Sequence, residues 1–188
     1  MPKVENGRCF FTQQLFLVGT YNDDGSANFA PISWVSYTWG SPSCLVISMF
    51  GNKRTKDNIA RDGFLTATIV TPDMLALVED LGGPPVADKG AAVASRGFRI
   101  DKARTIAAPL LDGTKFSYEC QVTKTVQIGD THTYFAEIKG VNMSDDVLNL
   151  DFFDLREINP VVYSPGHYFT IGEHLGKIGD FHRKDDKV

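Results

Sequence analysis

The sequence lacks several patterns that would indicate a function on their own. It contains no GxxxxGK[ST] phosphate loop and no GxGxxG fingerprint, so neither a P-loop enzyme nor a Rossmann nucleotide domain is indicated. No stretch approaches the roughly 20 apolar residues that cross a bilayer. The first residues do not read as a cationic and apolar signal peptide. We therefore expect no membrane partner and a cytoplasmic location.

Cysteine is scarce, and its three positions, Cys9, Cys44 and Cys120, form no CxxC pair. An odd number of unpaired cysteines favours structural thiols in a reduced compartment. The four histidines are His132, His167, His174 and His182. They lack ligand-like spacing to any cysteine, so we expect no metal site. Spacing also reveals no Ser-His-Asp or Cys-His arrangement.

Charge and length describe an ordinary soluble protein. The formal net charge is −4, with 22% charged and 43% hydrophobic residues. Nucleic-acid binding usually needs a basic face, so we expect no nucleic-acid partner. The 188 residues suit one domain, 1–188, with a core at 10–178 and a charged tail at 179–188.

Most of the chain reads as short strands separated by turns. LFLVGTYN runs into a hairpin signal at Asp24-Gly25, and CLVISMF, residues 44–50, reads as a buried strand. In FLTATIV, Leu65, Ala67 and Ile69 face one way. In KFSYECQVTKTVQI one face is predicted to carry Phe116, Tyr118, Cys120, Val122, Val126 and Ile128. Many short antiparallel strands with few helices predict a mainly β fold, closed as a barrel.

Two later segments depart from the strand pattern. Residues 72–81, PDMLALVEDL, predict a helix that ends at Gly82-Gly83. The Ala-rich stretch 86–113 predicts a helix followed by an irregular excursion. His132 lies in GDTHT, which predicts a hairpin turn.

The stretch GNKRTKDN gathers Lys53, Arg54 and Lys56 at the start of a predicted short helix. A helix N-terminus is already electropositive, so each added cation costs roughly 0.3–1 kcal/mol. Thr55 is predicted to cap this helix and Gly63 to end it. Such a helix start favours a phosphate site. The residues alone leave a solvated basic turn open as the alternative.

Both tryptophans, Trp34 and Trp39, fall in NFAPISWVSYTWG, which begins at Asn28. Pro31 lacks a backbone donor, so the strand is expected to be irregular or at a sheet edge there. Backbone groups exposed in this way could bond a ring system laid across them. The alternative is that the aromatic side chains are core and cross-strand pairs, which we favour for Tyr37 and Trp39.

The order of these features resembles the flavin-reductase-like family of FMN-binding split barrels, especially its flavoredoxin branch. The resemblance rests on LVGTYNDDGSANFAPISWVSYTWGSPSCLVISM, KRTKDNI and FLTATIVTPDM, and then on ADKG, FSYECQV, GDTHTYFAEI and PVVYSPGHYFTIGEHLGK. It runs from about Leu15 to Lys177. It implies a Greek-key antiparallel barrel that binds FMN non-covalently and forms a homodimer with flavin near the subunit interface.

The resemblance also implies the cofactor site. The KRTKDN segment and Ser48 would contact phosphate, the stretch 28–34 would follow the ring edge, and three later residues would approach the flavin. The implied cofactor-binding residues are Asn28, Phe29, Ala30, Pro31, Ile32, Ser33, Trp34, Ser48, Lys53, Arg54, Thr55, Asn58, Lys89, His132 and Tyr163. His132 is also the implied catalytic residue, near the hydride donor. Without the resemblance, Lys89 would read as a surface residue and Tyr163 as barrel packing.

The implied function is an FMN oxidoreductase that moves reducing equivalents from NAD(P)H to a flavin, small-molecule or protein acceptor. Two departures lie near the expected nicotinamide position. Ala136 replaces a glycine frequent in reductases, and the spacing Asp130-Thr131-His132 replaces a tighter GDH. A flavoredoxin-like electron carrier with a protein partner is therefore the second hypothesis. A flavin-free barrel that binds another ligand or partner is the third.

Overall fold

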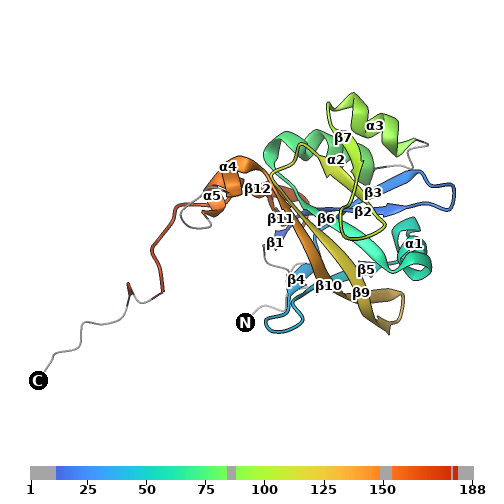
Figure 1. Cartoon of the computed structure of the whole chain (residues 1–188). Coiled ribbons are helices and arrows are strands. Elements are labelled where there is room, and N and C mark those ends of the chain that lie inside the picture. Colours follow the sequence, from blue (N-terminus) through green and yellow to red (C-terminus); the bar gives the residue numbers. More distant parts are fainter. Residues whose placement is uncertain (1–11, 84–87, 149–153, 179, 182–188) are drawn as a thin grey trace, which may run out of the picture.

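The computed structural model describes residues 12–83, 88–148, 154–178 and 180–181 (Figure 1). The strands are β1 Gln13–Gln14, β2 Phe16–Tyr21, β3 Ala27–Ile32, β4 Val35–Tyr37, β5 Cys44–Phe50, β6 Phe64–Ile69, β7 Arg99–Lys102, β8 Pro109–Asp112, β9 Phe116–Ile128, β10 Thr131–Met143, β11 Val162–Ser164 and β12 His167–Phe169. The helices are α1 Arg54–Asp62, the 3₁₀ turn η2 Pro72–Met74, α2 Leu75–Gly82, α3 Lys89–Ser95, α4 Asp145–Leu148 and α5 Leu155–Ile158. Within these ranges no helix has the length and apolar character needed to cross a membrane.

Seven strands form one antiparallel sheet in the order β3-β2-β6-β9-β10-β5-β4. Its two edge strands, β3 and β4, follow each other in the chain and are joined only by Ser33 and Trp34. The sheet curls into a barrel that stays open between these edges (Figure 1). The mainly β split barrel expected from the sequence is confirmed, and Pro31 lies on an edge strand as predicted.

The interior of the barrel is apolar because alternate residues of each strand point inward. On β6, Leu65, Ala67 and Ile69 join the interior cluster, as the alternation predicted. Thr66 and Thr68 face the other way and are also buried, because further elements cover that side of the sheet.

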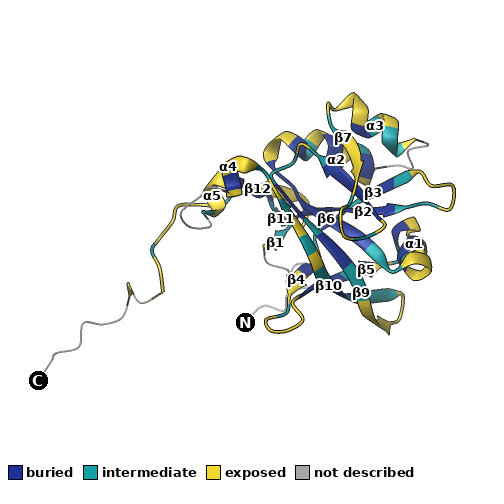
Figure 2. Ribbon diagram, viewed as in Figure 1, coloured by how far each residue is buried: buried dark blue, intermediate teal, exposed yellow. Residues whose placement is uncertain are grey.

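A second apolar layer lies outside the sheet, beneath α2 and α3 (Figure 2). Phe29 of β3 and Leu77 of α2 belong to this cluster, which includes Val93 of α3. Gly19 of β2 permits the close approach, since a Cβ there would lie 2.7 Å from the Phe29 ring and 2.8 Å from the Pro109 carbonyl oxygen. This layer fixes α2 and α3 against the edge strand β3.

Helix α1 closes one end of the barrel and buries Ile59 in the interior cluster. Its N-cap residue is Lys53, which makes no side-chain capping bond. The prediction that Thr55 caps the helix is therefore wrong, because Thr55 is already the second helical residue and is buried. Gly63 ends the helix with φ 72° in the left-handed region, as predicted.

The inward face of β9 is shorter than its period-two pattern predicted. Its first alternate residues, from Phe116 to Val122, do contact the interior core. Thr123 is then skipped in the register with β10, because Lys124 pairs with Phe135 while Val122 pairs with Ala136. One extra residue moves all following side chains to the opposite face. The pattern residues beyond the bulge are therefore exposed rather than in the core: Val126 and Ile128.

Three further expectations are corrected. Trp39 is fully exposed, because it lies past the end of β4 in the loop before Cys44. Tyr37 is 48% exposed, although its ring meets that of Tyr118 at a centroid distance of 6.1 Å. His132 lies on β10, since the turn itself is formed by the preceding Gly129 and Asp130.

The structure also shows which elements form in the two segments that departed from the strand pattern. The predicted helix 72–81 is present as η2 followed by α2. The predicted excursion 86–113 contains α3 and then an antiparallel hairpin, β7 with β8; residues 86 and 87 lie outside the described part. β1, β11 and β12 form a separate three-stranded sheet. Of the expected tail 179–188, only residues 180 and 181 are described.

Glu119 of β9 is a buried carboxylate that holds the β7–β8 loop on the outside of the sheet. It accepts bonds from the backbone N–H of Arg104 at 3.0 Å and of Thr105 at 2.6 Å. The Thr105 hydroxyl and the Asn142 amide add bonds of 2.6 and 2.7 Å. Burial raises the pKa of Glu119, but hydrogen bonds from Asn142, Thr105 and Arg104 outweigh it, so the pKa lies below the ordinary 4.5.

We predict that Glu119→Gln lowers the free energy of unfolding by about 1–3 kcal/mol at pH 7, because the donors keep a weaker acceptor. A carboxyl with a lowered folded pKa stabilises the fold above its unfolded pKa, and this is lost as pH falls through the folded value. The difference between variant and wild type should therefore shrink below pH 4.5. Urea unfolding at a series of pH values measures it, with the exposed Glu173→Gln as control. A difference that does not change with pH would contradict the assignment.

Candidate functional site

Three cations converge where α1 begins beside β3. Lys53 and Arg54 belong to the start of α1, and Lys89 is the first residue of α3. The Lys89 ammonium donates to the Phe29 carbonyl of β3 at 2.6 Å. The pKa of Lys89 is lowered, first by burial and then by the positive charges of Arg54 and Lys53. These side chains are therefore near enough to repel one another.

Among the described residues no carboxylate forms an ion pair with Lys53, Arg54 or Lys89, although Asp23 and Asp57 lie near the start of α1. Over the described ranges the side chains of Lys53 and Arg54 form no hydrogen bond or ion pair, and Arg54 acts on a carboxylate only by slightly lowering the pKa of Asp24, whose main partner is Ser26. The first backbone N–H groups of α1 lack a side-chain cap as well. An anion placed here would meet three cations and free helix donors, which is the donor set that suits a phosphate.

Lys56 is not part of this group. Its ammonium donates to the Gly51 carbonyl at 2.8 Å and to the Asp130 carbonyl at 3.0 Å. Those bonds tie the β9–β10 turn to the turn that precedes α1. The sequence left open which of the three basic residues of GNKRTKDN faces an anion. The choice stays a prediction, and Lys53 and Arg54 are the two whose side chains make no hydrogen bond among the described residues.

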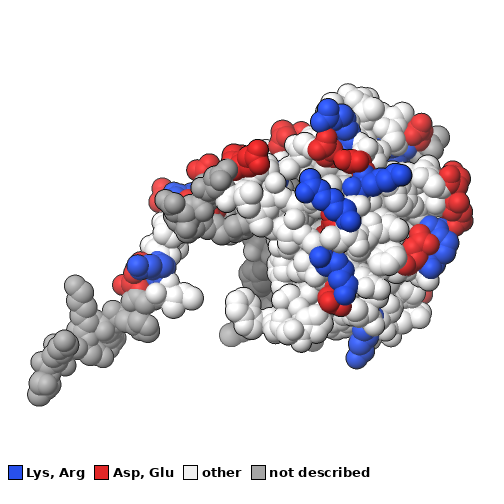
Figure 3. All heavy atoms as spheres, viewed as in Figure 1, with Lys and Arg blue, Asp and Glu red and all other residues white. Residues whose placement is uncertain are grey.

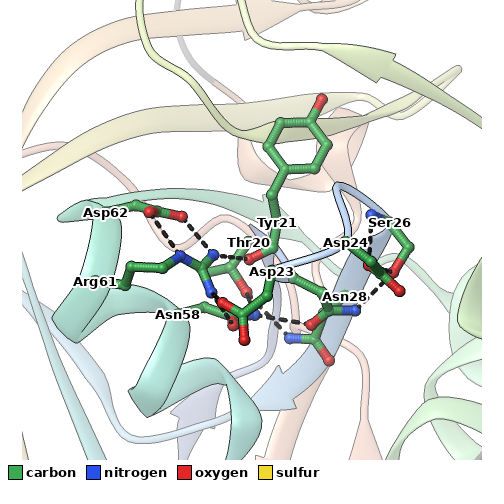
Figure 4. A network of polar contacts seen from close by, with 10 residues as sticks. Thr20, Tyr21, Asp23, Asp24, Ser26, Asn28, Asn58, Arg61 and Asp62 are labelled. Atoms are coloured by element: carbon green, nitrogen blue, oxygen red, sulfur yellow. Dashed lines mark hydrogen bonds and ion pairs between the residues drawn. The ribbon is translucent and has the colours of Figure 1, made fainter.

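An open cleft of about 500 Å³ lies at this helix start. Its lining residues are Asp23, Asn52, Lys53, Arg54, Asp57, Asn58 and Arg61. Arg61 was not predicted from the sequence. Its guanidinium donates to the Tyr21 carbonyl at 2.7 Å and pairs with Asp62 and Asp23 (Figure 4). It therefore joins α1 to the β2–β3 turn, and no motif in the sequence marks that contact.

A buried amide and hydroxyl network connects α1 to β2 and β3. The Asn28 amide donates to the Thr55 hydroxyl at 3.0 Å and to the Thr20 hydroxyl at 3.1 Å. The Asn58 amide donates to Thr20 at 3.0 Å and to Asn22 at 3.0 Å (Figure 4). The predicted site residues Asn28, Thr55 and Asn58 are thus brought together. Here they set the position of the helix start, and their donation to a phosphate stays a prediction.

A second cavity, of about 260 Å³, lies at the other end of β3. Its lining residues are Leu15, Pro31, Ser33, Val78, Glu79, Gly82, Gly83, Tyr163 and Tyr168. The rings of Tyr163 and Tyr168 are 6.0 Å apart between centroids. The Tyr168 hydroxyl donates to Glu79 at 2.5 Å, which fastens the β11–β12 hairpin to α2. Glu79, Tyr168 and Gly82 were missed, because only the fold brings EDLGG and PGHYF together.

Strand β3 contacts α1 at its start and the second cavity at its end: Asn28 bonds Thr55, and Pro31 lines that cavity. From Asn28 to Ser33, just past its end, the chain advances about 16 Å, since a strand rises about 3.3 Å per residue. Phe29 and Ile32 are buried with their side chains in the two cores, so they can offer only backbone to a ligand. Beyond β3, the Trp34 carbonyl accepts from the Ser48 N–H at 2.9 Å, and the Ser48 hydroxyl bonds that of Thr133 at 2.8 Å. The predicted stretch 28–34 and Ser48 are thus contiguous.

His132 of β10 pairs with Met49 of β5, the neighbour of Ser48. It lines neither of the two cavities described here, and its Nδ1 lies 3.3 Å from the Tyr134 hydroxyl. Burial, with a further contribution from Asp57 of α1, raises the pKa of Tyr134 to about 12. A catalytic role for His132 stays a prediction.

Charged side chains outside the site are mixed in sign. On the face that Figure 3 shows, Lys and Arg are interspersed with Asp and Glu over the body of the protein. Among the described residues no group of three or more His, Cys, Asp or Glu gathers to hold a metal ion.

Comparison with known proteins agrees with this geometry. The family model described as "Flavin reductase like domain" matches residues 7–172. The structure of flavoredoxin from Desulfovibrio vulgaris (Miyazaki F) superposes with a TM-score of 0.84 at 22% identity and covers 96% of this chain and 99% of that one. Flavoredoxin from Methanosarcina acetivorans gives 0.82 at 21% identity, with 96% of each chain covered. An uncharacterized protein of Aquifex aeolicus (strain VF5) is 23% identical over 161 residues, 81% of each chain.

The two kinds of site residue should respond differently to truncation. We predict that Asn58→Ala lowers the free energy of unfolding by about 1–3 kcal/mol, because it leaves buried partners such as Thr20 and Asn22 with fewer bonds. Lys53→Ala should change it by less than about 0.5 kcal/mol, as surface substitutions do. Urea unfolding of both variants without ligand measures this. Equal losses would mean that Lys53 is structural.

Proposed function

The chain belongs to the flavin reductase-like family, and from that premise we propose that it is an FMN-dependent oxidoreductase. It would take reducing equivalents from NAD(P)H and pass them to a flavin, a small molecule or a partner protein. Flavin-related oxidoreductase chemistry is what the family and the fold support directly. The choice of FMN and of NAD(P)H is the proposal.

The observation that carries the choice of FMN is the group of Lys53, Arg54 and Lys89, which no carboxylate pairs with among the described residues. Burial chiefly lowers the pKa of Lys89, and the charges of Arg54 and Lys53 lower it further. A phosphate monoester carries close to two negative charges at neutral pH, so it would relieve the part that comes from repulsion. The site extends from these cations along the β3 edge to the cavity at Tyr163. An elongated molecule with a phosphate at one end and a planar aromatic ring system fits that outline.

The protein's own residues would bind and orient this molecule. Lys53, Arg54 and the first N–H groups of α1 would hold the phosphate, and the backbone of residues 28–34 would lie along the ring edge. Lys89 is nearer to the phosphate end than the sequence implied, because its charged neighbours are Arg54 and Lys53. A bound flavin supplies the hydride and electron chemistry, so the chain needs no strong acid or base.

The replacement of a glycine by Ala136 is a weaker argument against the reductase once the structure is considered. Ala136 is fully buried in the interior cluster of the barrel, so its methyl group packs in the core and does not crowd a nucleotide face. The reductase hypothesis therefore remains ahead of the electron carrier. The structural likeness to two flavoredoxins keeps the carrier as the second candidate.

The test is to saturate the purified protein with FMN and to follow the blue absorption band without oxygen while NADH, then NADPH, is added. Prompt bleaching by either donor supports the reductase and identifies its nucleotide. A bound flavin that stays yellow but is reduced by dithionite supports the electron carrier. A protein that binds no FMN would refute both and leave the flavin-free barrel.

We predict that Lys53→Ala combined with Arg54→Ala weakens FMN binding by roughly 10- to 100-fold, since charge-assisted bonds contribute about 1.5–3 kcal/mol each and exposure reduces that. Binding of riboflavin, which lacks the phosphate, should not change. Fluorescence titration with both ligands measures the two affinities, and Lys124→Ala on exposed β9 is the matched control. Equal losses of affinity for FMN and riboflavin would show that the two cations do not contact the phosphate.

We also propose that the protein works in the cytoplasm as a homodimer. Cys44 and Cys120 are free and buried, and burial raises the pKa of Cys120 to about 12. Unreactive structural thiols suit a reducing compartment. The homodimer is supported by the family resemblance and by the exposed apolar surfaces described next.

A further inference from the structure

The chain ends its described part in an extended arm, residues 170–178 with 180 and 181, that leads away from the body (Figure 1). The base of the arm lies against α5, where Ile171 and Leu175 line a cavity of about 390 Å³ with Leu155. Leu175 is nevertheless 83% exposed. Farther out, Ile178 is 102% exposed, and Phe181 is exposed as well.

The hydrogen bonds made by the outer arm stay within it, as far as the described residues show. The Lys177 N–H donates to the Asp180 carboxylate, and the Asp180 N–H donates to the Lys177 carbonyl. An extended chain advances about 3.3 Å per residue. Apolar side chains held this far from their own core gain nothing from burial unless another surface covers them.

The barrel of the same chain has a sheet face that also exposes apolar side chains. On neighbouring strands β5, β10 and β9, Phe50 pairs with Thr131, which pairs with Ile128. Phe50 is 69% exposed and Ile128 is 76% exposed, and Val126 two residues earlier on β9 is exposed too. We call Phe50, Val126 and Ile128 the apolar row. α2 and α3 cover the other part of the sheet and leave this end open (Figure 2).

Two of the polar groups on this face already bond each other. Ser48 and Thr133 lie beside the exposed apolar residues, and their hydroxyls bond each other at 2.8 Å. A surface that covered them would leave these two hydroxyls paired. The hydroxyl of Thr131, between Phe50 and Ile128, would need a partner from the docked segment.

We propose that the arm of one copy docks on the apolar row of a second copy, and that the second arm returns the contact. This inference rests on the proposed homodimer and names the segment that builds it. A two-fold axis makes such a contact self-complementary, since each copy gives an arm and receives one. Each copy would contribute about ten residues of its own arm and a similar number at the face that receives the other arm. The total approaches the roughly 20–30 residues per side of a standard interface. The docked arm would lie next to Ser48 on the receiving copy.

The first test measures dimer dissociation of the full chain by analytical ultracentrifugation. We expect Leu175→Glu with Ile178→Glu, and separately Ile128→Glu, to raise the dissociation constant at least 100-fold. Thr170→Glu on the arm and Thr125→Glu on the other face of β9 add the same charge and should leave it unchanged. An arm variant that dimerises like the wild type overturns the arm contact but not the homodimer. A monomeric wild type overturns both, and the NAD(P)H titration still decides the flavin function.

The second test does not depend on a destabilising charge. Ile178→Cys protein is mixed with Ile128→Cys protein under mild oxidation, and disulfide-linked pairs are identified by peptide mapping. We expect a link between the two introduced thiols, and none when Thr125→Cys replaces Ile128→Cys. A link equally frequent with Thr125→Cys, or no link at all, would overturn the proposed receiving face.

Discussion

The structure depends on a small buried network that holds α1 against strands β2 and β3. Thr20 accepts from both Asn28 and Asn58, and Asn28 also donates to Thr55 of the helix. These groups are buried, so each needs its partner and the arrangement has little freedom. The network fixes where the helix N-terminus points relative to the edge of β3. The cationic part of the candidate site follows from that placement.

Two cationic side chains of α1 bond the turns on either side of the helix and so help to hold it in place. Lys56 holds the β9–β10 turn by two carbonyls, and Arg61 holds the β2–β3 turn through Tyr21 and Asp23. Both are therefore engaged within the protein, although they lie on the same helix as Arg54. The split in the barrel contributes the other half of the site, because an edge strand has backbone groups that no neighbouring strand uses.

The sequence predicted the barrel well, because the barrel depends on local patterns. Alternation identified the inward face of β6, Pro31 indicated an edge, and GNKRTKDN indicated the cationic helix start. Features that depend on tertiary contact were not predictable. The bulge at Thr123 reversed the end of β9, and the loop position of Trp39 left it in water. Arg61, Glu79 and Tyr168 join the site only because distant segments meet.

Lys53, Arg54 and Lys89 would couple the stability of the fold to the binding of an anion. Their mutual repulsion is unfavourable in the protein without ligand, and it adds to burial, the larger cause, in lowering the pKa of Lys89. An anion that binds only the folded state removes that repulsion and stabilises the fold by mass action, about 2.7 kcal/mol at a ligand concentration 100 times the dissociation constant. A carboxylate at the same place would neutralise the cations permanently and compete with the phosphate. Among the described residues no carboxylate forms an ion pair with these three cations, so the helix start keeps the positive charge that the proposed anion would neutralise.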